Sequence, residues 1–145
     1  MSDLAVPPGY QRHRRASGLT APWEPIFIRH HDHGLSLAIR ADQPHANSRG
    51  FVHGGLISAL ADNAMGLSCA DRLGGISGLV TVSMTLDFLG SARLGQWVEI
   101  RAEATRTGPS LNFAAAQVWA DDTLCARATA VFKALAPRPS AESSA

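Results

Sequence analysis

An apolar segment bounded by two pairs of glycines constrains the fold of this chain more than any other feature. Between Gly54 and Leu73 the sequence is rich in Ala, Leu and Ile; Gly54 and Gly55 stand at its start, and Gly74 and Gly75 follow it. Glycine is common where a helix ends. The segment therefore predicts one long, buried helix from Gly54 to about Leu73.

The segments on either side of this helix alternate apolar and polar residues, as half-buried strands do. A hairpin with a polar turn at His30 to Gly34 is predicted first, beginning at Trp23, and the clearest strand runs from Val80 to Phe88. Three more strands are predicted over residues 97–107, 111–120 and 123–135. Two strands, one helix and four antiparallel strands predict an α+β domain in which a single sheet curls around the helix.

Length and charge narrow the class of protein. A chain of 145 residues has the length of a single domain. Its net charge of +1 does not provide the strongly positive surface that binds nucleic acid. No secretory signal or membrane span is seen, so we expect a cytoplasmic protein. We expect residues 1–22 to form a poorly ordered arm that could wrap a partner. Residues 23–136 should form the folded domain, and residues 137–145 a disordered tail.

Few residues suggest a metal or a bound cofactor. Cys69 and Cys125 fit packed, reduced thiols rather than a disulfide framework. His31 and His33 could share one strand face and hold a metal, but a solvated hairpin turn is the favoured interpretation. The sequence has neither a phosphate loop nor a dinucleotide fingerprint. We therefore expect no metal and no cofactor.

The start of the helix and one acid within it suggest acyl-transfer chemistry. The Gly54 N–H, at the positive end of the helix, is a natural donor to the oxyanion of a tetrahedral intermediate. Asp62, a carboxylate near the middle of the apolar run with no Lys or Arg within a turn of it, could act as general base or as nucleophile. Eight residues of helix separate the two by about 12 Å, which is too far for one carbonyl. We therefore infer that Asp62 of one protomer acts with Gly54 of a second protomer, in a dimer whose two helices lie antiparallel.

The motif that carries these groups resembles a known family. Asn47, His53, Gly54, Gly55 and Asp62, with Gly50 and Asn63, are similar to the signature of the hotdog-fold acyl-CoA thioesterases of the phenylacetate-degradation type. The resemblance spans about Ile26 to Leu135. It implies a sheet of five or six strands around the helix, a dimer and usually a tetramer, and hydrolysis of acyl-CoA without a metal.

The resemblance also assigns roles to residues. It implies that the Gly54 N–H, supported by His53, polarises the thioester carbonyl, that Asn47 orients water or the carbonyl, and that Thr81 helps to hold Asp62 or the water. CoA itself would be the leaving part of the substrate. The residues implied to bind it, with Gly55 beside the carbonyl, are Phe88, Ser91, Arg93, Gly108, Ser110 and Leu111. Pro109 departs from the polar residue expected there and lacks an N–H.

Simpler interpretations remain open for several of these residues. Asp62 could be a structural acid that binds the N–H groups of a strand, and His53 could only cap the helix. Thr81 and Arg93 could be ordinary exposed polar residues. Two other functions also fit the fold: a non-catalytic acyl-CoA binding or sensor module, and a hydratase or dehydratase.

Overall fold

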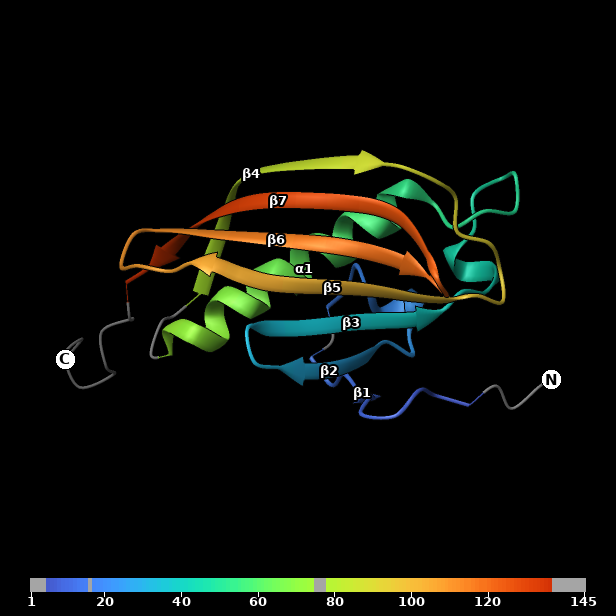
Figure 1. Ribbon diagram of the computed structural model, residues 1–145, viewed down its shortest axis with the longest axis horizontal. Coiled ribbons are helices and arrows are strands. Elements are labelled where there is room, and N and C mark those ends of the chain that lie inside the picture. Colours follow the sequence, from blue (N-terminus) through green and yellow to red (C-terminus); the bar gives the residue numbers. More distant parts are fainter. Residues whose placement is uncertain (1–4, 16, 75–77, 137–145) are drawn as a thin grey trace.

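One long helix, α1 (Gly54–Leu73), lies across the concave face of a single antiparallel sheet (Figure 1). The computed structural model describes residues 5–15, 17–74 and 78–136. The sheet has the order β1-β2-β3-β5-β6-β7-β4. Its strands are β1 (Gln11–Arg12), β2 (Phe27–His31), β3 (Gly34–Arg40), β4 (Gly78–Phe88), β5 (Trp97–Arg106), β6 (Leu111–Ala120) and β7 (Thr123–Leu135).

The predicted order of elements is confirmed, and the main differences are the start of the first long strand and the number of strands. The helix begins and ends where the glycine pairs predict, and Gly74 ends it with a φ of 57°. The first strand begins at Phe27 rather than Trp23, because Ala21–Trp23 forms a short 3-10 helix with Pro22 near its start. The sheet has seven strands rather than five or six, because the arm adds the two-residue strand β1. The predicted disordered tail and Gly75 lie outside the described residues.

The core is the contact between one face of α1 and the small side chains of the sheet. Leu60, Ala64 and Met65 on the helix are fully buried. Opposite them, β5, β6 and β7 present alanines, whose small side chains let the helix lie close to the sheet. Cys69 and Cys125 are buried and not paired with each other, as predicted for packed thiols, and burial raises the pKa of both.

A β-bulge in β4 reverses the side chains of that strand. Thr81 pairs with Phe132 and Ser83 with Val131, which leaves Val82 as the extra residue. Leu79 therefore packs on the core before the bulge, and Met84 packs on it after the bulge. The strand from Val80 to Phe88 is confirmed. The prediction that its apolar side chains all lie on one buried face is wrong, since Val80 and Val82 are 50% and 57% exposed.

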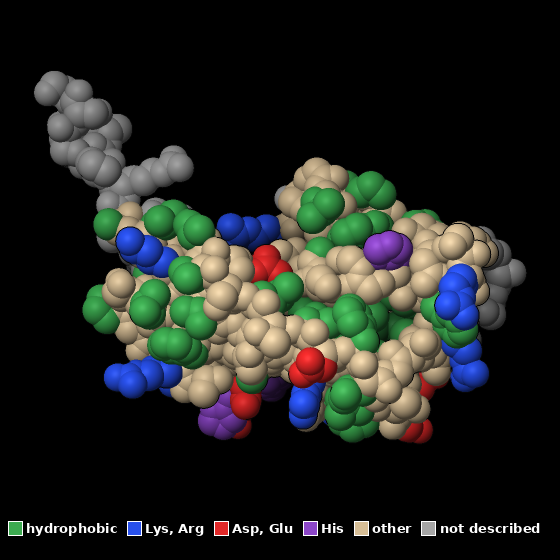
Figure 2. Space-filling view, turned by 90° about the horizontal axis from the view of Figure 1, so that it is seen from above, with side chains coloured by type: hydrophobic (Ala, Val, Ile, Leu, Met, Phe, Trp, Pro, Cys, Tyr) green, Lys and Arg blue, Asp and Glu red, His purple; other side chains and the backbone are tan. Residues whose placement is uncertain are grey.

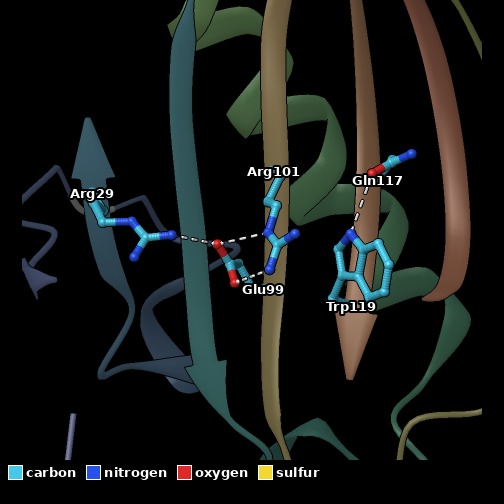
Figure 3. Close-up of polar contacts among 5 residues, drawn as sticks. All are labelled: Arg29, Glu99, Arg101, Gln117 and Trp119. Atoms are coloured by element: carbon cyan, nitrogen blue, oxygen red, sulfur yellow. Dashed lines mark hydrogen bonds and ion pairs between the residues drawn. The ribbon is translucent and has the colours of Figure 1, made fainter. Parts of the chain in front are cut away.

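The convex face of the sheet carries a buried acid held by two arginines. Glu99 on β5 lies 2.9 Å from Arg29 on β2 and 3.0 Å from Arg101 on its own strand (Figure 3). Burial raises the pKa of Glu99, but its contacts with Arg101, Tyr10 and Arg29 together lower that pKa below the ordinary value of 4.5. The cluster joins β2 to β5 across β3.

This lowered pKa predicts an acid-dependent stability. The folded protein binds fewer protons at Glu99 than the unfolded chain, so the contribution is present above the unfolded pKa and is lost as pH falls through the folded pKa. Urea unfolding should show that Glu99→Gln lowers the free energy of unfolding at pH 6 and has a smaller effect at pH 3. Glu103→Gln, an exposed position on the same strand, is the control; an equal pH dependence there would contradict the assignment.

Neither a metal site nor a membrane-spanning helix is found in the part of the chain that the structure describes. No group of three or more His, Cys, Asp or Glu side chains there could hold a metal ion. His30 instead lies 3.3 Å from Asp71 of α1. None of the helices described is long and apolar enough to cross a bilayer. Cytoplasmic localisation stays a prediction from the sequence.

Candidate active site

The start of α1 is shaped by a histidine cap and two glycines. His53 Nδ1 accepts a hydrogen bond of 2.7 Å from the Gly55 N–H, so the neutral ring carries its proton on Nε2. A Cβ on Gly55 would lie 2.9 Å from that nitrogen, and a Cβ on Gly54 would lie 3.0 Å from the ring of Phe88. A larger residue at Gly55 would displace the His53 ring from its capping position, and one at Gly54 would press on the Phe88 ring.

The cap leaves the Gly54 N–H at the start of the helix unused. His53 binds Gly55, not Gly54, and none of the described residues accepts a hydrogen bond from the Gly54 N–H. A donor without an internal partner at the positive end of a helix is suited to an anionic oxygen. The support that His53 gives to Gly54 is thus indirect, through the geometry of the turn.

Asn47 organises the loop that leads into the helix. Its side-chain oxygen accepts from the N–H of Arg49 at 2.9 Å and from that of Phe51 at 3.1 Å. Its backbone N–H also donates to the Phe51 carbonyl at 2.7 Å. These bonds occupy the oxygen and leave the amide N–H₂ as the group with which Asn47 could bind water or a carbonyl.

Asp62 lies in the third turn of α1, on the side of the helix that faces β4. Its Oδ1 accepts a hydrogen bond of 2.7 Å from the Thr81 hydroxyl, and no arginine or lysine among the described residues forms an ion pair with it. The side chain is half-buried rather than fully buried, because it lines an open pocket of ≈ 270 Å³. Thr81 reaches Asp62 because the β4 bulge turns its side chain toward the helix.

Within one chain, the two reactive groups lie at opposite ends of β4. Asp62 contacts Thr81 near one end of the strand, and Gly54 faces Phe88 at the other end. The eight residues of helix between Gly54 and Asp62 span about 12 Å. The structure therefore brings Asp62 and Thr81 together, and Gly54, His53 and Phe88 together, as two half-sites.

The residues implied to bind CoA are divided in the same way. Ser91 and Arg93 follow the end of β4, near the start of α1, whereas Gly108 to Leu111 connect β5 and β6 at the far end of the sheet (Figure 1). The Gly108 N–H already donates to the buried Asn112 side chain at 2.8 Å, so it is not free for a ligand, and a role for this segment in CoA binding stays a prediction. Pro109 has no N–H to replace it.

Sequence reasoning missed the polar residues that the N-terminal arm brings to the Asp62 pocket. His13, Arg15, Ser17 and Thr20 line it together with Asp62 and Asn63 of α1. The arm has no periodic pattern from which this position could be predicted. Its short strand β1, which fixes it beside β2, has only two residues.

One long helix that begins with two glycines, wrapped by an antiparallel sheet, defines the class of protein as a hotdog fold. Residues 49–126 match the family model described as the thioesterase superfamily. The chain belongs to this superfamily and is a thioester hydrolase. The resemblance inferred from the motif is thereby confirmed.

Individual relatives agree with this assignment. A Pseudomonas aeruginosa protein named "Putative esterase" is 38% identical over 130 residues, which are 89% of this chain and 97% of that protein. Human acyl-coenzyme A thioesterase 13 is 35% identical over 77 residues, 52% of this chain and 53% of the relative.

Solved structures share the fold. A phenylacetic acid degradation-related protein from Ralstonia eutropha has a TM-score of 0.72 at 24% identity, with 82% of this chain and 92% of that chain covered. A Streptococcus pneumoniae thioesterase protein, solved with coenzyme A, has a TM-score of 0.72 at 19% identity over 81% and 94% of the two chains. At these identities the likeness supports the fold alone.

Proposed function

We propose that the chain hydrolyses acyl-CoA thioesters to a carboxylic acid and CoA, in a site built from two protomers. The observation that carries the proposal is the pair of half-sites: a free Gly54 N–H at the helix start and a half-buried Asp62 held by Thr81 in a pocket. The human relative named above is an acyl-CoA thioesterase, which supports the substrate class.

The edge of the sheet supports the dimer. β4 is the last strand in the sheet, so one of its edges has no neighbouring strand among the described residues. Val80 and Val82 on it are exposed, and Figure 2, which looks onto this side of the molecule, shows hydrophobic side chains gathered there. A long edge strand with exposed apolar residues is a natural site for strand pairing. A tetramer of two such dimers remains a prediction.

The contacts of β4 also suggest the register of that pairing. If two copies of β4 pair antiparallel about a two-fold axis near Thr85, Thr81 lies opposite the partner's Phe88. Asp62, bonded to Thr81, then faces the partner's Gly54, which packs on that Phe88. The same symmetry brings Arg93 of one copy to the side where the partner's Ser110 and Leu111 lie, so that both segments could contact one CoA.

The proposed chemistry follows from this placement. The thioester oxygen accepts from the Gly54 N–H, with the Asn47 amide close to the same end of the helix, and negative charge develops on that oxygen as the carbonyl carbon is attacked. Asp62 of the other protomer either attacks the carbon itself or removes a proton from the attacking water. The carbon–sulfur bond then breaks, and CoA leaves as the thiolate. Where Asp62 itself attacks, an acyl–Asp62 anhydride is formed, and water then hydrolyses it to the carboxylic acid and free Asp62.

The proposed function is tested by release of free thiol. Short, long and aromatic acyl-CoA thioesters are incubated with the protein, and CoA is measured with a thiol reagent. We expect hydrolysis of at least one of these classes. Tight binding of acyl-CoA without any release of thiol would instead identify the chain as a binding or sensor module.

Thr81 should influence the reaction through Asp62. Thr81→Val keeps the shape of the side chain and removes the hydroxyl that donates to Asp62, so we expect kcat to fall about tenfold, the scale of a hydrogen bond to a charged group. Thr81→Ser should retain most of the rate. Thr129→Val, at an exposed threonine of the neighbouring strand β7, is the matched control, and an equal loss there would argue against a specific contact with Asp62.

A further inference from the structure

The walls of the Asp62 pocket differ in character. Its apolar side comes from the core, with Leu37, Leu60 and Phe132 among the lining residues. The polar residues His13, Arg15, Ser17 and Thr20 all come from the N-terminal arm. At about 30 Å³ for each water-sized group, a pocket of ≈ 270 Å³ has room for roughly nine non-hydrogen atoms. That is the size of a short acyl group.

The arm is fixed in place on both sides of Arg15. Before it, the Tyr10 ring packs edge-on against Trp97 at 5.2 Å and beneath the Arg29 guanidinium at 4.6 Å, and Glu99 holds that Arg29 (Figure 3). The His13 N–H donates to the Ile26 carbonyl at 2.8 Å. After it, Thr20 is only 4% exposed, so the rest of the domain covers its side chain, which also bonds with Ser17 at 2.9 Å. The arm is therefore a built part of the pocket wall.

Arg15 has a guanidinium that the fold does not use. Within the described residues, Arg12, Arg29, Arg101 and Arg127 each pair with an acid, and Arg15 does not. It lines the pocket that also contains Asp62, which the proposed reaction uses. A guanidinium binds a carboxylate with two parallel hydrogen bonds, and an apolar wall beside it accommodates the methylene chain that carries the carboxylate.

We propose that the pocket selects short acyl groups that end in a carboxylate, with Arg15 as the residue that recognises the distal carboxylate and His13 lining the wall beside it. This inference rests on the proposed thioesterase function and adds the substrate class. Burial and the charge of Arg15 lower the pKa of His13, so at neutral pH the imidazole is uncharged and can donate one hydrogen bond. The distal carboxylate and the scissile carbonyl then lie at opposite ends of one pocket.

Two thioesters of equal chain length test the inference. Adipoyl-CoA and hexanoyl-CoA differ in the terminal group alone, and kcat/KM is measured for both with the wild type, Arg15→Gln and Arg14→Gln. Arg14 neighbours Arg15 in the arm and does not line the pocket, so it is the matched control. We expect the wild type to prefer adipoyl-CoA by about tenfold, the scale of one charge-assisted contact. The preference should disappear in Arg15→Gln and persist in Arg14→Gln.

A second pair of substrates separates the acyl group from CoA as the ligand of Arg15. The adipoyl and hexanoyl thioesters of N-acetylcysteamine lack the nucleotide and its phosphates, and the wild-type preference should be the same with them. If Arg15→Gln slows both CoA thioesters equally and leaves the truncated ones unchanged, Arg15 binds the CoA phosphates and the inference is overturned. Hydrolysis without any chain-end preference also overturns it and leaves the proposed function standing. Failure to hydrolyse any acyl-CoA overturns both.

Discussion

Replacing Asp62 by Asn is expected to lower kcat for acyl-CoA hydrolysis by about 10²–10⁴, the usual contribution of a positioned acid or base. The amide is nearly the same size as the carboxylate and can still accept the 2.7 Å hydrogen bond from Thr81, so the pocket should keep its shape. What is lost is the ability to take a proton from water or to attack the carbonyl carbon. The rate of thiol release at saturating substrate is the measurement.

Asp71→Asn is the control for this substitution. Asp71 lies on the same helix nine residues further along and contacts His30, away from the pocket. Both variants should unfold at nearly the wild-type temperature and elute at the same size in gel filtration. Near-normal turnover in Asp62→Asn would rule out a catalytic Asp62 and favour the structural interpretation in which the acid only holds β4 against α1 through Thr81.

The parts of the fold predicted correctly are those that local patterns specify. The glycine pairs around the apolar run define α1 at both ends, and alternation defines β6 and β7 to the residue. The errors arise where tertiary contacts override the local pattern. Nothing in the sequence around Val82 marks the extra residue of the β4 bulge, since its neighbours Thr81 and Ser83 are ordinary strand residues.

The candidate site could be predicted only in part, for a related reason. The motif locates Asp62, His53 and Gly54, but which backbone N–H donates to a histidine cap depends on backbone geometry, and the donor to His53 is the Gly55 N–H. The exposure of Asp62 depends on which helix face meets the sheet. Arg15 enters the pocket because distant aromatic and charged contacts hold the arm, and no periodicity of the arm itself signals that position.

The shared site makes a stronger prediction than any single substitution, because two inactive proteins should restore each other. Gly54→Val would place a branched side chain against the Phe88 ring and over the free N–H, and we expect it to lower kcat by about 10²–10³, the contribution of one oxyanion donor. Asp62→Asn is inactive because it lacks the base or nucleophile. In a mixed dimer, the Gly54→Val protomer supplies Asp62 and the Asp62→Asn protomer supplies Gly54, so one of the two sites is intact.

The size of the recovery distinguishes a shared site from one within a single chain. If protomers assort at random, half of the dimers are mixed and each has one working site, so activity should return to about a quarter of the wild-type value. The two variants are denatured together, refolded and assayed for thiol release, and the separately refolded variants, mixed afterwards, are the control. If each active site lay within one chain, no mixed dimer would contain an intact site, and co-refolding would give only the residual rates of the parents. The converse check uses a chain that carries both substitutions, co-refolded with wild type. If Asp62 and Gly54 act within one protomer, the wild-type protomer of each mixed dimer keeps a working site. If the site is shared, both sites of the mixed dimer are inactive.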